Sequence, residues 1–231
     1  MSDTAVMLKT TLLAGAILLE NGAEIKRVED TMQRIATNAG YPDAQVFVLL
    51  TGITVSLPEN ATSEVRAIHN RGMDLEKVDQ VNSLSRQFAN HDIDLTEFAA
   101  ALERVNQAVP PFPFSWLCLA AVVVSVPLMV AFTGRTTPAD LITCGLAGLA
   151  GFAAFYWINR LGSIRFLSEF MGAFIIGLIT LLGFYLTNGH YHPDAIIIGA
   201  VMPLVPGVAI TNAVRDTMTG NLLSGPARAV E

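Results

Sequence analysis

The stretch FSWLCLAAVVVSVPLMVAF, residues 114–132, contains no charged side chain and decides the class of this protein. A helix needs about 20 residues, with a range of about 17–25, to cross the hydrocarbon core of a bilayer. Three later stretches of similar length and composition occupy residues 141–158, 166–187 and 195–211. Because lipid cannot satisfy free backbone groups, spans this closely spaced must be helices packed as antiparallel neighbours. The sequence therefore predicts a membrane α-helical bundle with four spans.

The residues that precede these spans have the composition of a water-exposed domain. Of the 14 Lys and Arg residues, 9 lie in the first 110 residues, together with 15 of the 20 Asp and Glu residues. A proline-rich and aromatic run then leads into the first span, as expected for a stiff linker with an interfacial anchor. We expect a cytoplasmic α+β domain at residues 1–109, a Pro-rich linker at 110–113 and a transmembrane helical domain at 114–231.

The α+β prediction for the first domain comes from its local patterns. Helical character over residues 4–19 and about 24–38 is followed by three short stretches rich in Val, Ile, Thr or Leu, which predict an antiparallel meander. These stretches are residues 45–50, 54–57 and 64–69. Asp74 and Asp94 are expected to be helix N-caps, Asp94 with Glu97 three residues on as an acidic version of the capping box.

Basic residues near the ends of the predicted spans indicate the orientation, because Lys and Arg concentrate in cytoplasmic loops. On the side of the first domain fall five arginines, whereas Arg135 falls on the other side. The five are Arg104, Arg160, Arg165, Arg215 and Arg228. The N-terminal domain is therefore expected to face the cytoplasm.

Composition and motifs argue against several classes of function. The formal net charge of −6, with no cluster of Lys and Arg, gives no footprint for nucleic acid. Cys118 and Cys144 lie inside apolar runs without metal-ligand spacing, so both are expected to be small apolar side chains. The sequence has no Gly-rich phosphate loop and no nucleophile motif. We expect no catalytic residue, no metal and no cofactor.

The fourth apolar stretch contains two prolines three residues apart, Pro203 and Pro206, followed by Gly207. Proline removes a backbone donor and clashes with a preceding carbonyl, so this helix is expected to break near the middle of the membrane, where transporters build substrate sites. The polar residues after the break would recognise a small carboxylate, with the guanidinium of Arg215 as the anion ligand. They are Thr211, Asn212, Arg215 and Asp216. The alternative is an ordinary kinked helix with a charged cap, and the compactness of the polar cluster favours the site.

Glu169 lies near the start of the third span, and an ionisable side chain inside a span is a candidate for proton coupling. The alternative, which its position near the cytoplasmic end favours slightly, is an ion pair with Arg165 or Arg160 at the membrane surface. A separate feature of the second span is a face of small residues, which predicts close contact with another helix. Its glycines are Gly145, Gly148 and Gly151.

Several segments of the chain resemble the threonine/serine exporter family. They are LLENGAEIKRVEDT at residues 18–31, TGI at 51–53, MPLVPG at 202–207, TNAVRD at 211–216, GN at 220–221 and SG at 224–225. The order of parts, a cytoplasmic domain before a membrane bundle, also matches. The chain is most similar to the larger, YjjP-type subunit of the family's split two-gene form, and this implies a small second membrane subunit of the YjjB type. The split form is associated with export of succinate-like dicarboxylates, and single-chain members with threonine and serine.

The resemblance also assigns residues. It places a transport motif at Pro203, Pro206, Gly207, Thr211, Asn212, Arg215 and Asp216. It places a second, cytoplasmic motif at Glu20, Gly22, Glu24, Arg27, Glu29 and Thr31. Relatives usually continue into a fifth span beyond the equivalent of residue 231, where this sequence stops. The resemblance implies a multi-pass protein of the bacterial inner (cell) membrane.

The expected function is that of one subunit of an oligomeric secondary exporter, which moves small carboxylates such as succinate out of the cytoplasm. Without a nucleotide-binding motif, an existing gradient must drive transport. Export of threonine or serine is the alternative. From a different class, the first domain could be a membrane-anchored hydrolase that uses Glu20, Glu24 and His69, or a sensor that gates the bundle.

Overall fold

The computed structural model describes residues 3–58, 61–109, 112–134, 137–162, 165–187 and 192–230. Its contacts form two compact units, Met1–Val109 with Pro206–Glu231, and Pro110–Val205. Part of the expected linker, Pro110 and Pro111, and Arg135 of the charge argument lie outside the described residues.

The N-terminal part of the first unit is α+β, as predicted. Its elements are α1 (Asp3–Glu20), α2 (Ile25–Asn38), β1 (Gln45–Leu49), β2 (Gly52–Leu57), β3 (Thr62–Ala67), α3 (Leu75–Ala89) and α4 (Leu95–Gln107). The strands form one antiparallel sheet in the order β1-β2-β3, so the predicted meander is confirmed. The second strand begins at Gly52, two residues before the predicted start, because Gly52 pairs with both Leu49 and Ala67.

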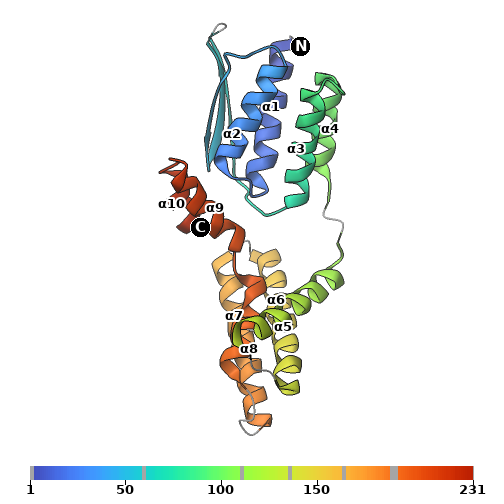
Figure 1. Ribbon diagram of the computed structural model, residues 1–231, viewed down its shortest axis with the longest axis vertical. Helices are drawn as coiled ribbons and strands as arrows, with labels where there is room; N and C mark the ends of the chain where they lie inside the picture. Colours follow the sequence, from blue (N-terminus) through green and yellow to red (C-terminus); the bar gives the residue numbers. More distant parts are fainter. Residues whose placement is uncertain are drawn as a thin grey trace. The chain divides into compact units, whose positions relative to one another are not determined.

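Helix α1 lies at the centre of this domain, in contact with α2, α3, α4 and the sheet (Figure 1). Its side chains are apolar on all sides, and those from Thr10 to Leu19 are buried. A helix that is apolar all round requires neighbours on every side, and here the other elements supply them. The surrounding helices are amphipathic and start where the sequence predicts: Asp74 accepts from the backbone N–H of Lys77, and Asp94 and Glu97 form the capping box.

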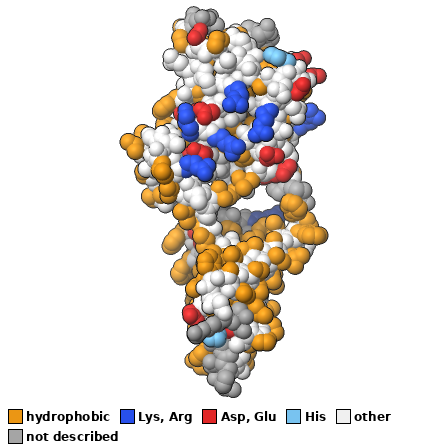
Figure 2. All heavy atoms as spheres, in the orientation of Figure 1, with side chains coloured by type: hydrophobic (Ala, Val, Ile, Leu, Met, Phe, Trp, Pro, Cys, Tyr) orange, Lys and Arg blue, Asp and Glu red, His pale blue; other side chains and the backbone are white. Residues whose placement is uncertain are grey.

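The second unit consists of helices α5 (Phe114–Thr133), α6 (Pro138–Gly162), α7 (Arg165–Leu186) and α8 (Pro193–Val201), with a 3₁₀ turn at Met202–Leu204. Three of these helices are long and apolar enough to cross a membrane, and there is a fourth span if Pro193–Leu204 and Gly207–Met218 count as one broken crossing. Only 22% of the most apolar window of each of the three is buried inside the structure. Large apolar side chains therefore face outward, as lipid contact requires, and Figure 2 shows them over these helices while charged side chains gather on the other unit.

Close packing in the second unit depends on small residues, as predicted for α6. A Cβ atom added at Gly151 would overlap the Ile176 side chain on α7, and one at Gly148 would overlap Ser125 on α5. Cys144 on α6 is buried as a free thiol between α5 and α8, and Cys118 on α5 is a half-buried free thiol. Small side chains let the backbones approach where lipid provides no hydrophobic drive for association.

The predicted break in the fourth apolar stretch is confirmed. After the 3₁₀ turn, Val205 is extended with ψ 124°, and helix α9 (Gly207–Met218) begins directly after Pro206. A short helix, α10 (Ser224–Val230), follows. The domain boundaries expected from hydropathy placed residues 206–231 with the membrane helices, whereas their contacts are with residues 1–109. The physical reason is that polar side chains of α9 and α10 bond to backbone groups of the first unit.

The packing of α8 leads to a stability prediction. A Cβ atom at Gly199 would lie 2.7 Å from the Ser125 carbonyl oxygen and 3.0 Å from the Cys144 sulfur. We expect Gly199→Ala to lower stability by about 1–3 kcal/mol, because overpacking a tight contact forces the helices apart. Gly177→Ala is the matched control, since nothing lies within 4 Å of its added Cβ. The midpoint of thermal unfolding in detergent measures both, and equal midpoints would contradict the proposed packing.

Candidate functional site

The turn between α1 and α2 exposes backbone groups in a fixed direction. Gly22 has φ +93°, a left-handed conformation that glycine adopts without strain. The N–H of Ala23 donates to the Leu18 carbonyl at 3.0 Å and that of Gly22 to the Leu19 carbonyl at 3.4 Å, which is the Schellman arrangement of a helix end. The carbonyl oxygens of Gly22 and Ala23 are then free to accept from elsewhere in the chain.

The donors to this turn come from α9 and α10. Helix α9 ends in the same arrangement, with Gly220 at φ +90° and the Asn221 N–H bonded to the Asp216 carbonyl. Helix α10 then packs tightly against α9, because a Cβ atom added at Gly225 would meet Thr217 and the Ala213 carbonyl. Side chains from both helices are thereby held toward the α1–α2 turn.

Four side chains of α9 and α10 bond to residues 22–25, and we call this set the polar bridge: Asn212, Arg215, Asp216 and Arg228. The amide of Asn212 donates to the Gly22 carbonyl at 2.8 Å, and Arg228 Nη2 donates to the Ala23 carbonyl at 3.1 Å. Arg215 Nη1 pairs with Glu24 Oε2 at 3.0 Å. The bridge thus joins parts of the chain that are about 190 residues apart in sequence.

Asp216 acts as a cap for helix α2. Its Oδ1 accepts from the backbone N–H of Ile25, the first residue of α2, at 3.0 Å. Glu24, at the N-cap position of α2, makes no side-chain capping bond. A carboxylate at a helix N-terminus satisfies a free donor and interacts favourably with the helix dipole. The capping group of α2 is therefore supplied from 191 residues away.

The two ion pairs of the bridge differ in burial. Asp216 is fully buried and the Arg228 side chain is 7% exposed, with Oδ2 and Nε 3.2 Å apart. This contact is an ion pair at that distance, although neither atom meets the geometry of a hydrogen bond. The Arg215 side chain, in contrast, is 64% exposed. Because a solvated pair contributes little, the buried pair is the stronger constraint on stability.

A second contact lies next to the bridge. The backbone N–H of Leu50 donates to Ser224 Oγ at 3.3 Å, and Arg71 Nη1 donates to the Leu50 carbonyl at 3.2 Å. Leu50 precedes the Thr51-Gly-Ile segment that the family resemblance singled out, and Ser224 begins its last segment. Parts of four segments of the resemblance, at residues 18–31, 51–53, 211–216 and 224–225, therefore converge on one region of the first unit, whereas residues 202–205 of the MPLVPG segment belong to the second unit. Arg228 and Arg71 were not predicted as site residues, and nothing in their local sequence distinguishes them from surface arginines.

The other residues of the cytoplasmic motif lie at the end of α1 or on α2. The Glu20 carbonyl accepts from the Gly72 N–H at 2.7 Å. Glu29 is half-buried, and burial raises the pKa of its carboxyl group, while the Val48 backbone and Lys26 oppose that shift. Arg27 is exposed and Thr31 half-buried on α2.

The predicted transport residues are divided between the units. Pro203 belongs to the second unit, and Pro206, Gly207, Thr211, Asn212, Arg215 and Asp216 belong to the first. The Thr211 hydroxyl bonds to carbonyls of its own helix, those of Gly207 and Val208. Glu169 lies half-buried on α7. The role of these residues in binding substrate or moving a proton stays a prediction.

A buried carboxylate in the second unit was missed at the sequence level. Asp140 is fully buried and accepts from the backbone N–H groups of Thr137 at 2.7 Å and His192 at 2.9 Å. Its Oδ2 also lies 3.1 Å from His192 Nδ1. The Asp140 N–H in turn donates to the Thr137 hydroxyl, so this is a capping box that also fixes the residue before α8. Thr-x-x-Asp before an apolar run is the signal that could have revealed it.

The hydrolase hypothesis finds no support in the geometry. Within the described ranges, no group of three or more His, Cys, Asp or Glu side chains could hold a metal ion. Glu24, which that hypothesis requires as an acid or base, is paired with Arg215. His69 is exposed after β3.

The buried pair leads to a stability prediction. Arg228→Met leaves Asp216 without its counter-charge, and we expect a loss of about 3–5 kcal/mol. Adding Asp216→Asn, which keeps an acceptor for Ile25, should recover part of that loss. Arg215→Met is the matched control and should cost about 0–1 kcal/mol, because its pair is solvated. Thermal unfolding compares the variants, and equal losses for Arg215→Met and Arg228→Met would contradict the ranking.

Comparison with known proteins places this arrangement in a family. The family model described as "Putative threonine/serine exporter" matches residues 9–231. A protein of Mycobacterium tuberculosis (strain H37Rv) named "Probable threonine/serine exporter" is 24% identical over 232 residues, which cover 97% of this chain and 42% of that relative. The chain thus spans less than half the length of the relative, and no solved structure matches it. This chain belongs to the threonine/serine exporter family.

Proposed function

We propose that this chain forms part of a secondary exporter that moves threonine and serine out of the cytoplasm. The observation that carries the proposal is the exporter-family match across residues 9–231, which includes the three helices able to cross a membrane. The sequence favoured succinate-like dicarboxylates as the main substrate, but no match supports that class. The alternative, a hydroxylated amino acid, fits the family and the named relative better.

The orientation and the partner belong to the same proposal. The excess of arginines on one side of the spans supports a cytoplasmic N-terminal domain. The apolar helices and the family match support a multi-pass membrane protein, which we assign to the inner membrane. The relative is more than twice as long as the region that this chain matches, and this supports a further component of the transporter. We assign that component to a small YjjB-type subunit in an oligomeric complex.

The polar bridge supports a coupling role for the N-terminal domain. Helix α9 follows the proline break directly, and its polar side chains are bonded to the α1–α2 turn. Any rotation of α9 about the break must therefore move that turn or break these bonds. One donor of Asn212 and one donor of Arg215 are engaged with Gly22 and Glu24, and a substrate carboxylate would bond to the N–H groups that these side chains still have.

The substrate prediction is tested by counterflow in vesicles that contain both subunits. Labelled threonine should exchange against internal threonine or serine, and succinate should not compete. Counterflow reports substrate identity independently of the driving force. The driving force differs between the two classes, because the membrane potential favours export of a dianion from a negative interior by about 4.6 kcal/mol per 100 mV and does not act on a zwitterion. Succinate exchange without threonine exchange would overturn the proposal.

The role of Arg215 is tested by exchanging charges with Glu24. Arg215→Glu and Glu24→Arg each replace attraction by repulsion and should lower counterflow several-fold. If Arg215 serves the bridge, the double variant restores the pair and counterflow returns to within about twofold of the wild type, since a solvated pair is worth about 0–1 kcal/mol. If its guanidinium instead binds the substrate carboxylate, the double variant stays inactive. Arg34→Gln, on the exposed face of α2, is the control for surface charge.

A further inference from the structure

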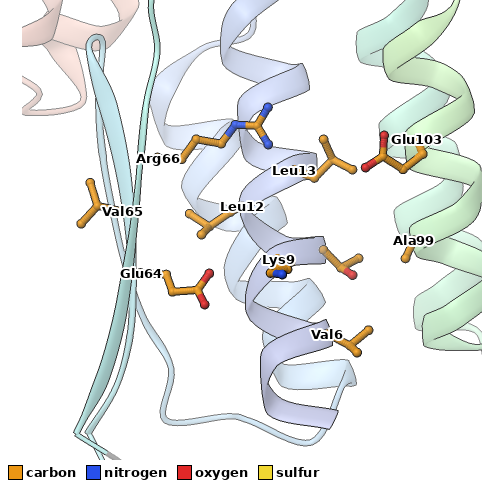
Figure 3. Close-up of a pocket in the computed structure, with 10 residues that line it drawn as sticks. Val6, Lys9, Leu12, Leu13, Glu64, Val65, Arg66, Ala99 and Glu103 are labelled. Atoms are coloured by element: carbon orange, nitrogen blue, oxygen red, sulfur yellow. The ribbon is translucent and has the colours of Figure 1, made fainter. Parts of the chain in front are cut away.

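A cavity of about 430 Å³ lies in the N-terminal domain, bounded by α1, β3 and α4 (Figure 3). Its volume is within the range of about 300–1,000 Å³ that is usual for small-molecule sites. All of its lining residues belong to the first unit and none belongs to the polar bridge. The function proposed above makes no use of it.

The floor of the cavity is apolar with one hydroxyl group. Leu12 and Leu13 of α1 line it and are 5% and 7% exposed. Thr10 lies one turn earlier on α1 and is 3% exposed. Its hydroxyl makes no hydrogen bond within the part of the chain that the structure describes. The floor therefore offers contact for a few aliphatic carbons and one polar partner.

The rim of the cavity carries two charges of each sign. Glu64 and Arg66 alternate with the outward-facing Val65 on β3, so both point toward α1, as Figure 3 shows. Glu103 reaches the same space from α4, and Lys9 is on α1. Among the residues that the structure describes, none of these four side chains has an ion pair or a hydrogen bond.

Unpaired charges of both signs around one small volume determine which ligand would fit. The two carboxylates of a dicarboxylate would be repelled by Glu64 and Glu103. The two ammonium groups of a diamine would be repelled in the same way by Arg66 and Lys9. A zwitterion pairs both sets at once, because carboxylate prefers the guanidinium and ammonium groups while an α-ammonium pairs with carboxylates. The small apolar floor limits the side chain to a few atoms.

We propose that this cavity binds a small zwitterionic α-amino acid. Its carboxylate contacts Arg66 and Lys9, its α-ammonium contacts Glu64 and Glu103, and its side chain lies over Leu12 and Leu13. A side-chain hydroxyl, as in serine or threonine, bonds to Thr10. The proposal that an amino acid binds here depends only on the residues of the cavity. Its use as a cytoplasmic sensor of the exported amino acid rests on the proposed function.

The test is calorimetric titration of the full chain in detergent with L-threonine, L-alanine and succinate. Threonine should bind saturably at one site, alanine more weakly because it lacks the hydroxyl, and succinate not at all. Arg66→Gln and Glu103→Gln should each weaken threonine binding at least about tenfold, as loss of a charged hydrogen bond does. The matched controls, Arg34→Gln and Asp79→Asn, are exposed outside the cavity and should bind as the wild type does.

Two outcomes overturn the proposal. One is the absence of saturable threonine binding to wild-type protein that unfolds cooperatively. The other is binding that survives both cavity substitutions but is lost in Asn212→Ala, which would place the ligand after the span-four break. Neither Arg66 nor Glu103 has a partner within the described residues, so both substitutions should leave the stability unchanged. The midpoint of thermal unfolding checks that each variant is folded. Because titration does not depend on transport, binding without threonine counterflow would retain this site and reject the exporter proposal.

Discussion

The carboxylate of Asp216 is the group on which the first unit depends. It is fully buried, it caps helix α2 through the Ile25 N–H, and it is neutralised by Arg228 from the next helix. A buried charge is tolerated only where its bonds are supplied by the fold itself. The positions of α9, α10 and the start of α2 are therefore mutually dependent, and none of the three can shift without exposing or stranding a charge.

Local rules were sufficient to predict most of the elements. The three long apolar helices, the meander, the capping box at Asp94 and the break between Pro203 and Gly207 all follow from composition, period and backbone chemistry within a few residues. Each of these signals lies within one segment of the chain. The same holds for the glycine face of α6, where close contact needs only the absence of a side chain.

The candidate site was predicted in part. Asn212, Arg215 and Asp216 were singled out for their position after the proline break, and the cytoplasmic motif for its resemblance to relatives, but nothing local relates one to the other. Their pairing is a long-range contact, and hydropathy assigns α9 to the membrane because Gly207 to Ile210 are apolar. The cavity was missed because its charges come from α1, β3 and α4 and look like ordinary surface residues when each segment is taken alone.

The division of the chain makes the membrane unit an insertion within the first unit. Residues 1–109 leave the ribosome before the three helices that are long and apolar enough to cross a membrane, yet Asp216, which caps α2, is synthesised only after all three. Domains generally fold in the order of synthesis, so the early domain starts with an uncapped helix and an unfilled acceptor at Gly22. The first unit can therefore be completed only after α8 has been synthesised. A chain whose translation stops earlier would keep an uncapped α2 and an open, protease-sensitive α1–α2 turn.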